Sequence, residues 1–67
     1  MRLSPRKLEI LTLVAQGYTD KEIGQILRIS VRTVQTHISF IVSDLSARNR
    51  TNAVALYMQQ HPHWKIK

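Results

Sequence analysis

The side chains best suited to recognition chemistry lie in one segment, ISVRTVQTHISFI, residues 29–41. Its apolar residues Val34, Ile38 and Ile41 recur at helical spacing and predict one buried face. Short side chains let a helix approach a groove of duplex nucleic acid, where Gln suits adenine and Thr offers both a hydroxyl and a methyl group. The polar side chains point away from the buried face, with one at its edge: Arg32, Thr36, Ser39, Ser43 and, at the edge, Gln35.

The residues of the sequence give little support for catalysis or metal binding. The chain has no Cys, which removes disulfides, thiolate catalysis and Cys-based zinc sites. His37 has no second ligand at helical spacing, and the two imidazoles of HPHW, residues 61–64, make a weak metal site. We therefore expect no enzyme activity, no metal, no cofactor and no small-molecule ligand within this chain.

Helices must position the polar stripe, and their start and stop signals are easy to read. Ser4 followed by Pro5, and Ser30 before the stripe, have the residue types of helix N-caps. Thr19 and Glu22 have the spacing of a capping box. No period-two strand pattern occurs, so we predict an all-α, four-helix bundle with helices at about 5–16, 20–27, 31–46 and 51–60.

The two middle helices form a distinctive pair. In helix 20–27, Ile23, Ile26 and Leu27 are expected to face inward, and Gly24 indicates close approach of another backbone. The turn at 28–30 is very short. A short capped helix, a tight turn and a longer helix predict a helix-turn-helix, although plain helical bundles share this periodicity.

Charge and length limit the possible partners. Ten Lys and Arg against four Asp and Glu give a net charge of +6, which favours an anionic polymer or surface. The basic residues form no polybasic block and no apolar run could span a membrane, so we expect a soluble, cytoplasmic protein with no membrane partner. With 67 residues we expect one domain, 1–60, followed by a C-terminal tail, 61–67.

Several motifs together resemble the LuxR-type (GerE-like) helix-turn-helix domain of bacterial transcriptional regulators, including response regulators. The resemblance spans about residues 3–56. The shared motifs are Leu3-Ser4-x-Arg6, Gly17-x-x-x-Lys21-Glu22-Ile23, Ile29-Ser30, Thr33-Val34 with His37, and Arg50 followed by Ala53-Val54.

The resemblance implies sequence-specific binding to duplex DNA, with helix 31–46 in the major groove. It also implies a homodimer on DNA through helix 51–60, and it makes RNA polymerase a further candidate partner. The residues that it assigns to bases are Gln35, Thr36 and Ser39; to the DNA backbone Lys21, Arg32, Thr33 and Arg50; and to the dimer Ala53, Leu56 and Tyr57.

Some positions depart from the family pattern. Lys7 stands where the family usually has Glu, Asp20 where it favours Asn, and Gly24 where Ala is usual. Gln35 replaces the most common Lys, and Asp44 lies at a generally basic position. A weakened basic face leaves a second hypothesis open, a protein-interaction module that docks on a partner regulator with weak or no specific DNA binding.

Overall fold

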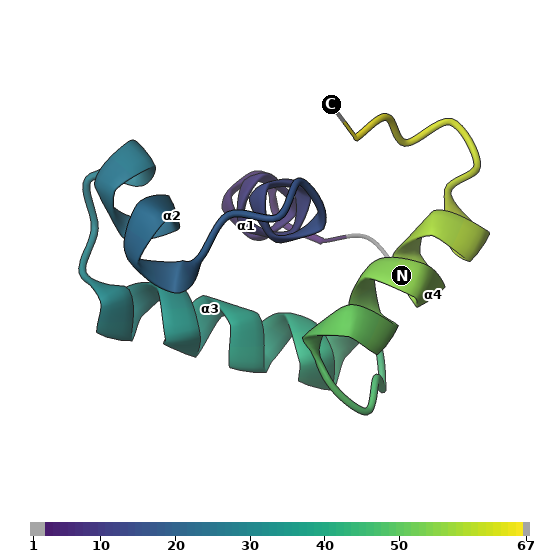
Figure 1. Ribbon diagram of the computed structural model, residues 1–67. Coiled ribbons are helices and arrows are strands. Elements are labelled where there is room, and N and C mark those ends of the chain that lie inside the picture. The colour runs from purple at the N-terminus through teal and green to yellow at the C-terminus, as the bar shows by residue number, and fades with distance from the viewer. Residues whose placement is uncertain (1–2, 67) are drawn as a thin grey trace.

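The computed structural model describes residues 3–66, and within them the chain folds into four α-helices and no strands (Figure 1). The all-α prediction is confirmed, with the ends of the helices shifted by one or two residues. The last turns of the first and third helices stop early, next to positive φ angles of 95° at Gly17 and 53° at Ser46. The helices are α1 Pro5–Ala15, α2 Asp20–Leu27, α3 Val31–Asp44 and α4 Arg50–Gln60.

Side-chain caps set the starts of these helices. The Ser4 and Ser30 hydroxyls accept from backbone N–H groups in the first turns of α1 and α3, as predicted. The capping box is complete, because the Thr19 hydroxyl accepts from the Glu22 N–H and the Glu22 carboxylate accepts from the Thr19 N–H. At α4 the Asn49 side chain accepts from the Asn52 N–H at 2.8 Å, which explains why this helix begins at Arg50.

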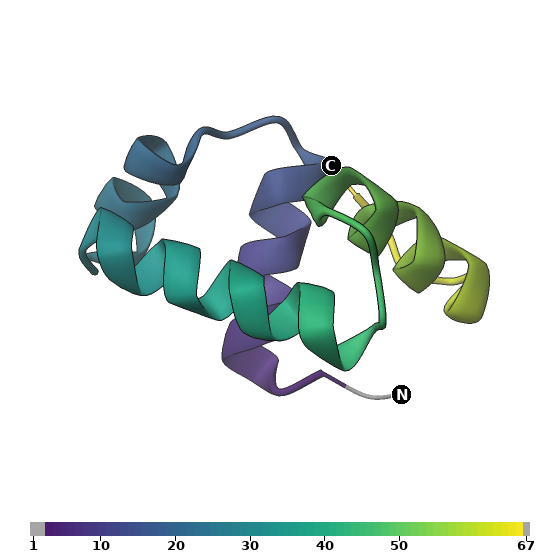
Figure 2. The same cartoon turned by 90° about the horizontal axis from the view of Figure 1, so that it is seen from below.

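The core lies where α3 crosses α1, with α2 and α4 on either side of the crossing (Figure 2). Its largest fully buried side chains are Ile10 and Leu11 on α1, Ile23 on α2, and Val34 and Ile41 on α3, and the small Ala53 on α4 is fully buried as well. The inward face predicted for α3 is therefore confirmed. The inward position predicted for Ile26 is wrong, because its side chain is 49% exposed on the outer face of α2.

The turn between α2 and α3 is held by close backbone contact. A Cβ atom on Gly24 would lie 2.7 Å from the Ile29 carbonyl oxygen, and the Ile29 N–H donates to the Gly24 carbonyl. Arg28 caps α2 in the left-handed region, with φ 59°. The expected close approach at Gly24 is confirmed, and it brings α3 tightly against α2.

Two of the departures from the family pattern contact each other. The Lys7 ammonium on α1 donates to the Asp44 carboxylate at the end of α3, with an N–O distance of 2.9 Å. It also lies 5.3 Å from the centre of the Phe40 ring. In this chain the two departures therefore form an ion pair with each other.

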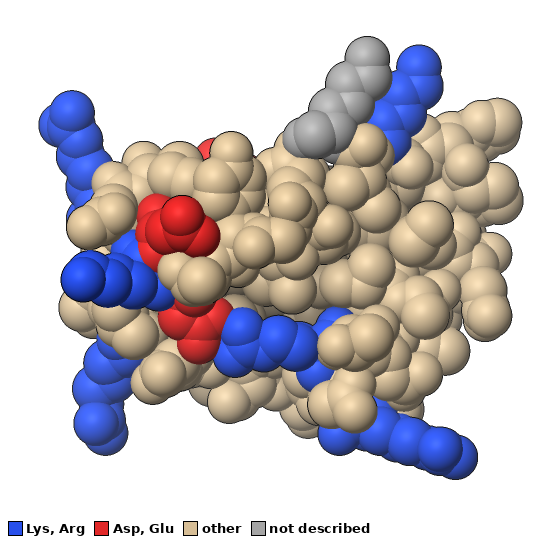
Figure 3. Space-filling view, viewed as in Figure 1, with Lys and Arg blue, Asp and Glu red and all other residues tan. Residues whose placement is uncertain are grey.

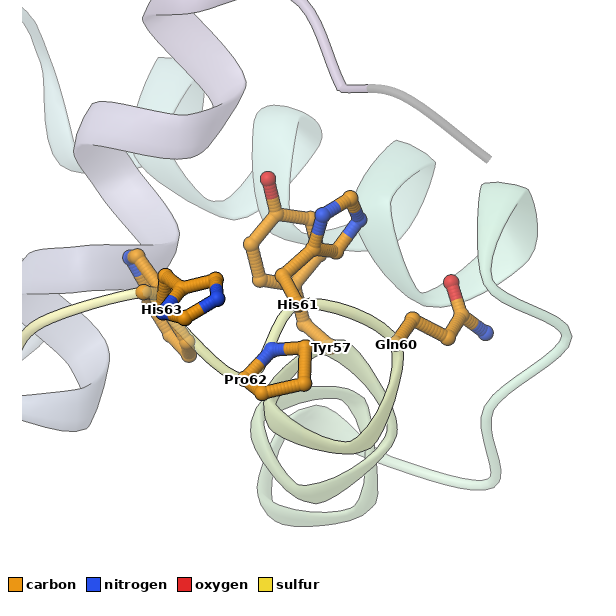
Figure 4. Close-up of a pocket in the computed structure, with 6 residues that line it drawn as sticks. Tyr57, Gln60, His61, Pro62 and His63 are labelled. Atoms are coloured by element: carbon orange, nitrogen blue, oxygen red, sulfur yellow. The ribbon is translucent and has the colours of Figure 1, made fainter.

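The chain after α4 folds back onto the helices. Trp64 packs against the core, donates from its indole N–H to the Thr12 hydroxyl at 3.2 Å, and meets the Tyr57 ring edge-on. The His61 ring stacks on Tyr57 with centroids 4.1 Å apart (Figure 4). Residues 61–66 thus cover one end of α4, and Lys67 of the predicted tail lies outside the described residues.

Candidate nucleic-acid interface

The polar stripe of α3 faces away from the core along the helix. Gln35, Thr36 and Ser39 are all exposed, and Arg32 is exposed one turn before Thr36. The helix carries these side chains on the side opposite Val34, so the structure brings together the residues that the sequence grouped. Between residues 31 and 43 of α3, Arg32 is the only charged side chain, so the rest of this surface is neutral, and the large Phe40 side chain is exposed on the same helix.

Hydrogen bonds within and at the start of α3 already occupy some of the donors and acceptors of these side chains. The Thr36 hydroxyl donates to the Arg32 carbonyl at 3.0 Å, so its methyl group and oxygen lone pairs remain for a ligand. The Thr33 hydroxyl is 2.9 Å from the Ser30 hydroxyl and its backbone N–H is bound to the same group. Thr33 is therefore held by the cap of α3, and Thr36 suits a partner that donates a hydrogen bond or offers a methyl group.

Basic side chains surround the stripe. Lys21 at the start of α2 and Arg32 at the start of α3 are both exposed, as is Arg28 in the turn between these helices. Figure 3 shows Lys and Arg side chains projecting from the end of the molecule where α2 and α3 lie, with acidic side chains set among them. The arrangement attracts polyanions, because most of its free charge is positive.

An ion pair connects α4 to this surface. The Arg50 guanidinium donates through Nη1 to Oδ1 of Asp20 and through Nη2 to Oδ2 at 3.0 Å. These hydrogen bonds lower the pKa of the Asp20 carboxyl, partial burial opposes them, and the Arg50 charge and a hydrogen bond from the Gln35 side chain lower it further. Asp20 thus joins the start of α2 to the start of α4.

The sequence reasoning missed this contact between Asp20 and Arg50. It assigned Arg50 to a DNA phosphate and noted Asp20 only as a departure from Asn. The acidic replacement was a usable signal, because a new carboxylate near a basic surface needs a cationic partner. The sequence alone did not identify that partner, because the two residues lie 30 positions apart.

Burial corrects two of the predicted dimer residues. Ala53 is fully buried and the Tyr57 side chain is 5% exposed, and both belong to the core of this chain. Neither can meet a second copy in this conformation. Leu56 is half-buried, and Met58 on the same helix is 48% exposed. A dimer contact through α4 would therefore use its outer side, where Leu56 stays a predicted contact.

Among residues 3–66, no group of three or more His, Cys, Asp or Glu side chains could hold a metal ion. His37 is half-buried, and its Nδ1 atom has no hydrogen-bond partner in the described part of the chain. An open hollow near the C-terminus is lined by Tyr57, by Gln60 and by residues 61–64 (Figure 4). None of the helices in the described range is both long and apolar enough to cross a membrane.

Comparison with known proteins agrees with this arrangement. Residues 1–57 match the family model of bacterial regulatory proteins described as the luxR family. The chain is 48% identical over 59 residues to the transcriptional regulatory protein LiaR of Bacillus subtilis. It is 46% identical over 59 residues to the response regulator protein VraR of Staphylococcus aureus and to that of Staphylococcus epidermidis. Each alignment covers 88% of this chain and 28% of the relative, so the chain spans under a third of their length.

Proposed function

The chain belongs to the luxR family of bacterial regulatory proteins, and from that premise we propose that it binds duplex DNA in a sequence-specific way and regulates transcription. The names of its relatives, a transcriptional regulatory protein and a response regulator, support this role. No catalytic step is part of the proposal. The domain acts by occupying a DNA site.

One observation carries the proposal: α3 presents an exposed stripe of short polar side chains between basic flanks. A helix enters the major groove only if its outer side chains are short enough for close approach. Serine and threonine along this stripe meet that requirement. A helix face that served only as solvated surface would not need this freedom from long charged side chains.

Each exposed residue then has a proposed role. Gln35 reads a base edge through its amide, and Thr36 and Ser39 contact neighbouring bases. Lys21, Arg32 and Thr33 hold the DNA backbone and fix the position of α3 without carrying sequence information. Arg50 adds a backbone contact at the start of α4, where its guanidinium is 42% exposed beside Asp20.

We also propose that two copies bind DNA side by side through the side of α4 that carries the half-buried Leu56. Two recognition helices one helical turn apart would read two half-sites. Because Ala53 and Tyr57 lie in the core, a substitution there would unfold the domain and would not test this dimer. Leu56→Glu, placed at a half-buried position, is the informative variant.

Selection of bound sequences from a random duplex library tests the function. The proposal expects a recovered motif, with half-sites if the dimer forms, and binding that weakens steeply with salt. The second hypothesis, a module that docks on a partner regulator, rests on a weakened basic face, because Gln35 replaces the most common Lys and Asp44 lies at a generally basic position. It expects no recovered motif and a binding constant for duplex DNA that stays low even at low salt.

A further inference from the structure

An exposed aromatic side chain borders the polar stripe of α3. Phe40 is 54% exposed, although its neighbour Ile41 is almost completely buried. Phe40 follows Thr36 by four residues and Ser39 by one. A helix turns by about 100° per residue, so the Phe40 side chain points within about 40° of the direction of Thr36. The ring therefore lies on the outer side of α3, next to the residues proposed to face DNA.

An ion pair holds the ring from one side. The Lys7 ammonium lies 5.3 Å from the centre of the Phe40 ring, close enough for the cation to be attracted to the ring face. The Asp44 carboxylate, one turn further along α3, accepts from the same ammonium at 2.9 Å. The pair restrains the ring, and the ammonium offsets a negative charge that would otherwise repel phosphates beside it.

One group of duplex DNA suits an apolar ring at this position. The base edges in the major groove present hydrogen-bond donors and acceptors and a single kind of apolar group, the C5-methyl group of thymine. A Phe side chain cannot exchange hydrogen bonds with the polar edges, whereas it can pack against this methyl group. Phe40 also reaches further than Thr36 or Ser39, which suits a position beyond the first turns of a recognition helix, where the base edges are closest.

A protein-docking patch is the alternative explanation for an exposed aromatic ring. Such patches are contiguous and cover several hundred Å². Within residues 3–66, the other exposed large hydrophobic side chains lie on other segments or at the start of α3, roughly 13 Å from Phe40 along the helix axis; they are Tyr18, Ile26, Val31 and Met58. Phe40 is thus not part of a run of exposed apolar side chains on α3, and the net charge of +6 favours a polyanion.

We propose that Phe40 is a specificity-determining residue, which packs against the C5-methyl group of a thymine in the major groove. This inference rests on the proposed function, because it takes α3 as the recognition helix. It adds an apolar contact to the hydrogen bonds proposed for Gln35, Thr36 and Ser39, and it predicts a thymine at a fixed position in the recognised sequence.

The test replaces each thymine of the selected duplex, the one recovered from the random library, by uracil. Uracil keeps the pairing with adenine and lacks only the methyl group. Wild type should bind about fourfold more weakly at one such position per half-site, the factor expected for the burial of one methyl group. Phe40→Ala should bind the thymine and uracil duplexes equally at that position, because the two losses are not additive when the groups are in contact.

Two further variants separate Phe40 from its neighbours. Thr36→Ser removes the only other methyl group proposed to lie near a base, and it should leave the fourfold effect of uracil at the Phe40 position intact. Phe40→Met, which keeps an apolar side chain of similar reach, should retain sensitivity to uracil. The salt slope of Phe40→Ala should equal that of wild type, because no cation is removed.

The uracil series on wild type needs no variant, so the inference can fail even if Phe40→Ala does not fold. A wild type that binds every uracil duplex as tightly as the thymine duplex would overturn the inference alone. A uracil effect that persists in Phe40→Ala and disappears in Thr36→Ser would assign the contact to Thr36 and would also overturn it. A wild type with no preference among duplex sequences would overturn the proposed function and the inference together.

Discussion

At the scale of single residues, Asp20 shows how one substitution changes several interactions. The carboxylate binds Arg50 through two hydrogen bonds, one from each terminal nitrogen of the guanidinium. The same residue holds α4 against α2, and it lies beside the recognition stripe. Its ionisation should therefore affect both the stability of the domain and its DNA binding.

The pH dependence of folding should report this contact. Hydrogen bonds from Arg50 lower the pKa of Asp20 in the folded chain, relative to about 3.9 in an unfolded one. The stabilisation is thus complete above the unfolded pKa and is lost as the pH falls through the folded one. On acidification from pH 6, the free energy of unfolding should fall less for Asp20→Asn than for wild type. The difference between the two falls should be below about 1 kcal/mol, because solvent screens the partly exposed Arg50 side chain.

Chemical denaturation at a series of pH values between about 6 and 2 measures this difference. Glu9→Gln is a matched control, since Glu9 is exposed and, within residues 3–66, its ion pair is with Arg6 at 3.6 Å. If the Asp20→Asn and wild-type curves stayed parallel over this range, the Asp20 pair would contribute nothing to folding.

Sequence reasoning at this scale predicted exposure better than contacts. It grouped Gln35, Thr36 and Ser39 on one outer face because helical periodicity fixes the direction of every side chain. It placed Ala53 and Tyr57 on a dimer surface, yet both are buried. The amphipathic pattern of α4 is weak, so periodicity there could not separate an inner face from an outer one.

At the scale of elements, local signals determined where helices begin more accurately than where they end. Caps at Ser4, Thr19 and Ser30 were each predictable, because a side-chain oxygen must satisfy N–H groups at a helix start. The end of α3 was not, because Ser46 adopts a positive φ without any glycine to signal it. Tertiary packing sets that end.

The Lys7–Asp44 pair between α1 and α3 has an unfavourable polarity for both helices. Lys7 lies in the first turn of α1 and Asp44 is the last residue of α3, so each charge opposes its helix dipole. The swapped pair Lys7→Glu with Asp44→Lys should be more stable than wild type by about 0.5 to 1.5 kcal/mol. Each single change should be destabilising, by up to about 1 kcal/mol, because like charges then meet.

Denaturation of the four proteins in this double-mutant cycle measures the coupling between the two residues. If the effects of the two single substitutions simply add up to the effect of the double substitution, the two side chains do not interact in solution. The exposed pair Arg6 and Glu9, swapped in the same way within α1, provides a comparison without a second helix.

Gly24 controls the angle between α2 and α3. A larger side chain would have to displace the Ile29 carbonyl, which lies 2.7 Å from the position of a Cβ atom. We expect Gly24→Leu to lower the free energy of unfolding by at least about 2 kcal/mol. Gln25→Leu, at the exposed neighbouring position, should change it by less than about 0.5 kcal/mol. Equal effects of the two substitutions would mean that the turn can open without cost.

At the scale of the whole molecule, the small core depends on packing by the helices and by the chain after α4. Among residues 3–66, ten hydrophobic residues are buried fully or nearly so, and small domains of this kind are marginally stable. Trp64 adds a further layer against Tyr57 and Thr12. The sequence suggested a tail here, because HPHW contains a helix-ending proline and no periodic pattern, and such a pattern cannot reveal a return onto α1.

Removal of this layer should weaken the whole fold. We expect Trp64→Ala to lower the free energy of unfolding by about 1 to 3 kcal/mol, less than a fully buried Trp because the side chain is only half-buried. Far-UV circular dichroism during chemical denaturation measures it, since the variant lacks the single Trp. The exposed His63→Ala is the control. If the Trp64→Ala protein were as stable as this control, the packing of Trp64 would contribute nothing to the stability of the fold.

Fold and surface together lead to one central claim, that α3 reads base pairs through Gln35 while nearby cations hold the DNA backbone. The most direct measurement titrates wild type, Gln35→Ala and Lys21→Ala against the selected duplex, its single-base-pair variants and a random duplex at fixed salt. Gln35→Ala should cost about 1 to 3 kcal/mol on the preferred duplex, flatten preference at one position and leave random binding nearly unchanged.

Lys21→Ala is the matched control, because it removes an exposed cation beside the same stripe. It should weaken all duplexes by a similar factor, keep their ranking and reduce the salt slope by about one. The claim predicts these two opposite patterns from neighbouring surface positions. A Gln35→Ala protein that keeps the wild-type ranking across every single-base-pair variant would contradict it.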